Sequence, residues 1–118
     1  MGRLKKHLNE VVNKSWNFAG RLKTPQEHQM NAIVGLAAEA GEVLDVGKKA
    51  WFHTEKSLES FREKIILELG DVFYYALKVM DLFDISLKEV LDKNREKLES
   101  RHPELGKVKE RFSGDYIK

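Results

Sequence analysis

Residues 33–44 read IVGLAAEAGEVL and residues 65–77 read IILELGDVFYYAL, and these two stretches decide the fold. Each holds two carboxylates three positions apart in otherwise apolar sequence: Glu39 and Glu42 in the first, Glu68 and Asp71 in the second. A spacing of three places both acids of a pair on one face of an α-helix. The sequence therefore predicts two helices that each present a pair of acids.

Helix-capping patterns and prolines give the expected bounds of the helices. Thr24-Pro25-Gln26-Glu27 offers an N-cap threonine, a proline at the first helical position and a glutamate for a capping box. Two similar boxes begin at Ser60 and Ser86, and Pro103 cannot continue a helix. We therefore expect four main helices, covering residues 3–18, 25–52, 57 or 60 to 82 or 83, and 87–102, with no strand and no assignment for the tail, 103–118.

The bulk properties indicate one globular all-α domain over residues 1–118. Charged residues make up 34% and hydrophobic residues 42%, and only 2 prolines occur among 118 residues. The net charge is +2 with both signs interspersed, so no nucleic-acid partner is expected. The absence of cysteine excludes disulfides and thiolate metal sites. Because the first residues are polar and no apolar run reaches membrane-spanning length, we expect a cytoplasmic protein without a membrane partner.

Apolar residues cover more than half of the circumference of the third predicted helix. A surface helix of a monomer needs only one apolar stripe. One explanation is a central helix wrapped by the other three, and the other is a helix covered by its own chain on one side and by a second subunit on the other. A chain of 118 residues has little material for a wrapped centre, so the oligomer is favoured. The apolar set is Ile65, Ile66, Leu69, Val72, Phe73, Ala76, Leu77, Val79, Met80 and Phe83.

The four acids point to a divalent cation. Carboxylates that converge between two helices repel each other and lose hydration. An all-oxygen ligand set with room for water suits Mg²⁺, and Mn²⁺ would also fit. Glycines near the acids, such as Gly35, Gly41 and Gly70, would let two backbones approach. The alternative of solvated surface acids suits two pairs within apolar runs poorly, and a di-iron bundle would want Glu-x-x-His motifs, which Glu39 and Glu68 do not begin.

Glu-x-x-Glu followed in a later helix by Glu-x-x-Asp resembles the motif of the all-α NTP pyrophosphatases, which include MazG, dimeric dUTPases and phosphoribosyl-ATP pyrophosphatase. The segments GLAAEAGEVLDVGKKAWFH, KIILELGDVFYYAL and DISLKEVLDKNREKLESRHP look like short MazG-like proteins, and the resemblance spans roughly residues 31–103. It implies that Glu39, Glu42, Glu68 and Asp71 bind Mg²⁺, which bridges the phosphates and activates the attacking water. It also implies a helical bundle completed by a second subunit, in a homodimer or homotetramer.

Further polar residues share the acid-bearing faces and are candidates for substrate binding. Asn31 is expected near the base or sugar. His28 is a candidate for the same contact, although an ordinary surface position is favoured for it, and Lys49 would meet a phosphate or else lie solvated at the helix end. Tyr75 projects beside Glu68 and Asp71, so it is a candidate for stacking on the base, or else a core residue. Lys78, beside this face, would meet a phosphate or water. On the last helix, Asn94, Lys97 and Arg101 share a stripe that suits a triphosphate, or else form a solvated face. The sequence does not decide whether Trp16 and Trp51 line a base pocket or fill the core.

The function expected from these observations is Mg²⁺-dependent conversion of an NTP or dNTP and water to the monophosphate and pyrophosphate, in nucleotide-pool control. Glu39 or Glu42 would take the proton of the water. Two alternatives remain open: a related dUTP or phosphoribosyl-ATP pyrophosphatase, and a non-catalytic helical interaction module with a structural metal.

Overall fold

The computed structural model describes residues 2–16, 20–52 and 58–107, and within these residues every regular element is helical. The first helical segment consists of α1 (Gly2–His7), a π-helical turn η1 (Leu8–Val12) and α2 (Asn13–Ser15). The long helices are α3 (Pro25–Phe52), α4 (Arg62–Leu82) and α5 (Leu87–Arg101). Short 3₁₀ turns, η2 (Leu58–Phe61) and η3 (Pro103–Lys107), precede α4 and follow α5.

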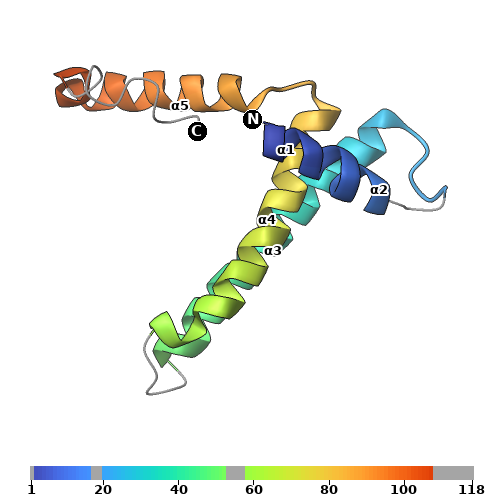
Figure 1. Cartoon of the computed structure of the whole chain (residues 1–118), viewed down its shortest axis with the longest axis horizontal. Coiled ribbons are helices and arrows are strands. Elements are labelled where there is room, and N and C mark those ends of the chain that lie inside the picture. Colours follow the sequence, from blue (N-terminus) through green and yellow to red (C-terminus); the bar gives the residue numbers. More distant parts are fainter. Residues whose placement is uncertain (1, 17–19, 53–57, 108–118) are drawn as a thin grey trace.

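Helices α3 and α4 form an antiparallel pair that runs through the molecule (Figure 1). Ala32, Val46 and Ala50 of α3 are buried, and small side chains such as alanine allow two helix axes to lie close together. Near the open end, the Gln29 amide donates to the Leu82 carbonyl at 3.3 Å and joins the two helices again. This pairing brings the two predicted acid-bearing segments face to face.

At two of the three predicted capping boxes the N-cap side chain accepts the expected hydrogen bond. The Glu27 amide donates to Thr24 Oγ1 at 3.1 Å, and the Glu89 amide donates to Ser86 Oγ at 3.0 Å. The box predicted at Ser60 was wrong, because Ser60 lies inside the 3₁₀ turn η2 and Phe61 occupies the N-cap of α4 without a side-chain cap. The predicted bounds of α3, α4 and α5 are otherwise confirmed within two residues.

The first helix ends earlier than predicted and is not a regular α-helix. Its α-helical part stops at Ser15, and residues 17 and 18, which the prediction included, lie outside the described part of the chain. Between Leu8 and Val12 the helix widens to a π-turn, in which the Asn13 amide donates to the Leu8 carbonyl. The segment crosses the open end of the α3–α4 pair (Figure 1), where Val12 is fully buried.

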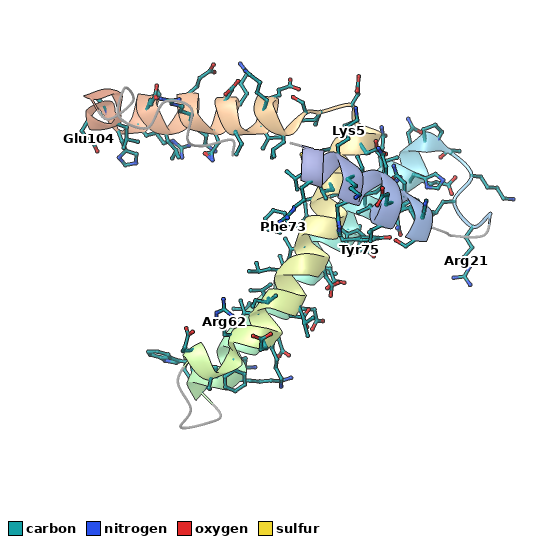
Figure 2. All side chains as sticks on the ribbon, in the orientation of Figure 1. Lys5, Arg21, Arg62, Phe73, Tyr75 and Glu104 are labelled. Carbon is teal, nitrogen blue, oxygen red and sulfur yellow. The ribbon has the colours of Figure 1, made fainter. Side chains whose placement is uncertain are left out.

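Helix α5 leads away from the α3–α4 pair, so the four helices do not close into a bundle within one chain (Figure 1). The radius of gyration is 17.5 Å, whereas a compact domain of this length has a value of about 13–14 Å. Helix α4 is not wrapped on all sides, and Figure 2 shows Phe73 directed outward from it, at 58% exposure.

Large apolar side chains remain exposed along both helices of the pair. On α3 they are Met30, Ile33, Val34, Leu44, Trp51 and Phe52, and on α4 Ile66, Leu67, Leu69 and Phe73. Among the described residues, no helix has the length and apolar content needed to cross a membrane.

Candidate functional site

Three carboxylates meet between α3 and α4. Oxygen atoms of Glu39 on α3 and of Glu68 and Asp71 on α4 all lie within 4.8 Å of one another. Glu68 and Asp71 stand one helical turn apart on the same face of α4, opposite Glu39. One ion bound between the two helices would therefore be within reach of all three side chains.

Glu42, the fourth predicted acid, lies one turn further along α3 and is outside this mutual set. It is exposed, and it lines a crevice of about 290 Å³ together with Glu68. Its charge still acts on the cluster, because it is one of the groups that raise the pKa of Glu39. The acids thus form a group of three with Glu42 beside it.

The cluster carries more negative charge than its surroundings compensate. Burial raises the pKa of the Glu39 carboxyl, and the charges of Asp71, Glu68 and Glu42 raise it further. In the described part of the chain, none of these four acids forms an ion pair with a lysine or arginine. Converging carboxylate oxygens without a cationic partner fit a hard divalent cation such as Mg²⁺.

Tyr75 adjoins the cluster at the point where α3 and α4 come closest. A Cβ atom at position 35 would stand 2.6 Å from Cζ of Tyr75 and nearer still to two other ring carbons, so the ring lies directly on the Gly35 backbone. Burial raises the pKa of the Tyr75 phenol, and the nearby charges of Glu39 and Asp71 add to this effect. Gly35 is therefore required for close packing of α3 against α4. Gly41 and Gly70 border open space in one chain, so the close approach predicted at these two glycines was wrong within one chain.

An aromatic cluster surrounds Tyr75 and joins three segments of the chain. The Trp16 indole lies edge-on to Tyr75, with ring centroids 6.0 Å apart, and its Nε1–H donates to His28 Nδ1 at 3.0 Å. Tyr74 stands edge-on to Tyr75 at 5.2 Å, and its hydroxyl bonds the Ser15 hydroxyl at 2.8 Å. Figure 2 shows Tyr75 where the first helix crosses the α3–α4 pair. Trp16 thus lies beside the acid site, while Trp51 lies exposed near the far end of α3.

The crevice on the other side of the acids contains two lysines. Lys49 and Lys64 line it from α3 and α4, together with Glu42 and Glu68. Lys49 forms an ion pair with Asp45 at 2.8 Å, and this hydrogen bond raises the pKa of its ammonium group. Sequence reasoning missed Lys64, although its position four residues before Glu68 places it one turn away on the same helix.

The remaining predicted site residues fall into two groups. Asn31 is half-buried on α3, one turn before Gly35, and His28 is engaged with Trp16. Within a single chain, Asn94, Lys97 and Arg101 are exposed on a helix that leads away from the acids (Figure 1), so their contact with a triphosphate stays a prediction. A shared helix face can be derived from residue spacing, but the direction of the helix cannot.

Lys78 was predicted to meet a phosphate or water, but its side chain is buried. Its Nζ donates to Asn13 Oδ1 at 2.9 Å and lies 3.5 Å from the Asp81 carboxylate. It also stands 5.1 Å from the centre of the Trp16 ring. Lys78 therefore connects α4 to the first helical segment.

Comparison with known proteins identifies the family. A protein-family model described as the MazG nucleotide pyrophosphohydrolase domain matches residues 26–106, which include all four acids and the whole of α5. The chain belongs to the MazG family. It is also similar to the Gene 37 protein of Mycobacterium phage L5, at 33% identity over 69 residues that cover 58% of this chain and 60% of the phage protein. The match thus spans less than two thirds of that relative, and no solved structure matches the chain.

The contact between Gly35 and Tyr75 predicts that alanine substitutions at Gly35 and Gly47 of the MazG domain change its stability in opposite directions. Gly35→Ala should lower the free energy of unfolding by about 1–3 kcal/mol, because the added methyl overlaps the Tyr75 ring. Gly47→Ala in the same helix meets no neighbour and should raise it by about 0.5–1 kcal/mol, the gain from alanine over glycine. Urea unfolding measures both.

The double variant Gly35→Ala/Tyr75→Leu serves as the control for this pair. The double variant should recover part of the lost free energy of unfolding, because the methyl group added at position 35 overlaps with the aromatic ring of Tyr75. Equal stabilisation by Gly35→Ala and Gly47→Ala would contradict the contact.

The raised pKa of Glu39 gives an expected pH dependence in metal-free protein. Glu39 binds its proton more readily in the folded state than in the unfolded chain, so its contribution to stability falls as pH rises from its ordinary pKa through the raised one. Glu39→Gln should therefore be more stable than wild type near neutral pH, and the difference should shrink below about pH 4.

Urea unfolding in EDTA measures this difference, with Glu63→Gln on the exposed start of α4 as the control. Mg²⁺ should reverse the order by stabilising wild type by about 2.7 kcal/mol at a hundredfold excess over its Kd. A Glu39→Gln effect that is the same at both pH values would contradict the charge argument.

Proposed function

We propose that this protein is a Mg²⁺-dependent nucleoside triphosphate pyrophosphohydrolase, which converts an NTP or dNTP and water to the monophosphate and pyrophosphate. The observation that carries the proposal is the meeting of Glu39, Glu68 and Asp71 oxygens within 4.8 Å of one another, between the two helices of a MazG domain. A structural metal could use the same acids. The lysines and aromatic groups on either side of the cluster favour a substrate instead.

The order of groups along the α3–α4 pair suits an extended nucleotide. The aromatic cluster of Trp16, His28 and Tyr75 lies on one side of the acids, and the crevice with Lys49 and Lys64 lies on the other. Tyr75 and Lys64 are about 16 Å apart along the axis of α4, at 1.5 Å per residue. We infer that the base lies at the aromatic cluster, with Asn31 near the sugar, and that the phosphates extend past the acids toward the lysines.

Glu39, Glu42, Glu68 and Asp71 are the residues that would hold the cation. Bound there, Mg²⁺ supplies positive charge to the phosphates and lowers the pKa of water. The three clustered acids fix its place from two helices, and Glu42 reaches the same region from the next turn of α3. Lys49 and Lys64 add compensating charge where the pyrophosphate leaves.

The chemical step is hydrolysis between the α and β phosphates. The oxygen of water bonds to the α-phosphorus, the bond from that phosphorus to the bridging oxygen breaks, and the bridging oxygen leaves with pyrophosphate. Glu39 or Glu42 accepts the proton of the water, because both lie on the α3 side of the cleavage point. The protein positions the two reactants relative to each other.

A second copy of the chain completes the site in this proposal. Within one chain, α5 leads away from the acids, and the α3–α4 pair leaves ten large apolar side chains exposed. In a homodimer or homotetramer these apolar faces pack together. Asn94, Lys97 and Arg101 of one subunit then reach the phosphates held by the acids of another, which agrees with the charge that a triphosphate requires.

Loss of one acid tests the catalytic assignment. Asp71→Ala or Glu42→Ala should lower Mg²⁺-dependent pyrophosphate release by more than about a hundredfold, because a metal ligand is lost. The circular dichroism spectrum should stay helical, since neither side chain is buried. Glu63→Ala, an exposed acid on the same α4 helix, is the control and should retain wild-type activity.

The assay uses a panel of ribo- and deoxyribonucleoside triphosphates, including dUTP, and phosphoribosyl-ATP. Release from dUTP or phosphoribosyl-ATP alone would narrow the substrate to that compound. Absence of release from the whole panel, or full activity of both acid variants, would overturn the proposed function.

Mixing inactive subunits tests whether α5 serves a neighbouring site. If Lys97 acts across the interface, Asp71→Ala and Lys97→Ala subunits that associate at random should recover about one quarter of wild-type activity, because half of the dimers then hold one intact site. The two variants are co-expressed with different tags, and light scattering measures the assembly. A monomer of 13.7 kDa, or no recovery from mixed dimers, would contradict the shared site.

A further inference from the structure

Lys78 is the one charged residue that is buried in the described part of the chain, with 7% of its surface exposed. Burial of an ammonium group is costly unless polar partners replace its water. Its partners are Asn13 Oδ1 at 2.9 Å, the Asp81 carboxylate at 3.5 Å and the face of the Trp16 ring at 5.1 Å. Asp81 belongs to the same helix, but Asn13 and Trp16 both belong to the N-terminal segment that crosses it.

The π-turn places these partners on the side that faces α4. A π-turn holds one residue more per turn than an α-helix, and removing that residue would rotate everything after it by about 100°. Asn13 and Ser15, which follow the turn, contact Lys78 and Tyr74 of α4. The local departure from α-helical geometry therefore coincides with the contacts between the first segment and the site helix.

Trp16 has no helix of its own to hold it. It follows the last residue of α2, with backbone angles outside the helical region. Its indole is fixed by the bond to His28, by the Lys78 ammonium over its ring and by the edge-on contact with Tyr75. Lys78 contacts both the ring and Asn13, three positions before it, so it connects the indole and its backbone segment to α4.

We propose that Lys78 is a positioning residue for nucleobase selection, which holds Trp16 against Tyr75 through the Asn13 hydrogen bond and the cation–π contact. This inference rests on the proposed function, because it assumes that the base of a nucleoside triphosphate binds at the aromatic cluster. Lys78 does not touch the substrate. It sets the shape of the surface on which the base is recognised, through its contacts with Asn13 and Trp16.

The test compares Lys78→Met, which keeps the length of the side chain and removes its charge, with Lys78→Arg, which keeps a cation. Steady-state pyrophosphate release from the triphosphate panel with Mg²⁺ gives KM, kcat and the ratio of kcat/KM between the best and the poorest base. Lys78→Met should raise KM for the preferred nucleotide and reduce that ratio by about fivefold or more, with a smaller change in kcat. Lys78→Arg should restore part of both. Lys93→Met, on the exposed side of α5, is the control.

Trp16 emission gives a readout that does not depend on activity. The chain has 2 tryptophans, so Trp51→Phe leaves Trp16 as the single tryptophan, which is excited at the red edge of the absorption band where tyrosine does not absorb. In that background Lys78→Met should shift and broaden the emission toward that of exposed tryptophan, and Lys78→Arg should shift it less. Asn13→Ala, which removes only the hydrogen bond, should change emission and base ratio in the same direction and serves if Lys78→Met does not fold.

The positioning role is overturned if Lys78→Met melts earlier while KM and base ratio equal those of wild type, since Lys78 would then be structural only. It is also overturned if Lys78→Met fails to fold and Asn13→Ala leaves both emission and base ratio unchanged. An active wild type with an unaltered Lys78→Met removes this inference alone. A wild type that releases no pyrophosphate from any member of the panel removes the proposed function and this inference together.

Discussion

The rest of the structure depends on the pairing of α3 and α4, which holds carboxylates of like charge close together. Glu39 on one helix faces Glu68 and Asp71 on the other, and their repulsion opposes the pairing of the two helices. Small side chains such as Ala32 and Ala50 bring the helices close, and the Tyr75 ring lies on the bare backbone of Gly35 one turn from the acids. The packing contact between Tyr75 and Gly35 therefore lies next to the carboxylates that repel each other. A cation bound between these carboxylates would remove the repulsion.

Different groups lie at the two ends of the α3–α4 pair. The N-terminal segment covers the open end, where Val12 is buried and polar bonds reach α4 through Tyr74 and Lys78. The other end opens into a crevice with two lysines. Since one chain buries so few apolar side chains, much of the remaining hydrophobic surface of α3 and α4 is available for contact with another copy.

The sequence predicted the features that depend on local chemistry. Thr24 and Ser86 cap helices as expected, because a side-chain oxygen needs only the amide three residues later. The pairs of acids were predicted from their spacing and their apolar surroundings, and the family from the two motifs together. Tyr75 was predicted beside Asp71 from helical geometry, and it lies near enough for the Asp71 charge to act on its pKa.

Features that depend on the path of the chain between helices escaped prediction. The sequence of Leu8–Val12 has the apolar spacing of an ordinary helix, so the π-turn has no local signal. The direction of α5 depends on the turn before it, where Asp84 adopts a φ of 54°, and residue spacing cannot reveal this. From the sequence, Lys78 was expected to meet a phosphate or water. Its hydrogen-bond partner Asn13 lies 65 positions earlier in the chain, and residue spacing cannot reveal that contact.

The π-turn also determines how this chain would respond to a change in its length. A π-turn differs from an α-helical turn by one residue. Insertion or deletion of one residue between Leu8 and Val12 would therefore rotate the side chains of Asn13, Ser15 and Trp16 relative to α4. The acids on α3 and α4 lie in separate helices and would keep their register through such a change. The contacts that the first segment makes with α4 thus depend on the π-turn, whereas the acid cluster depends on the pairing of α3 and α4.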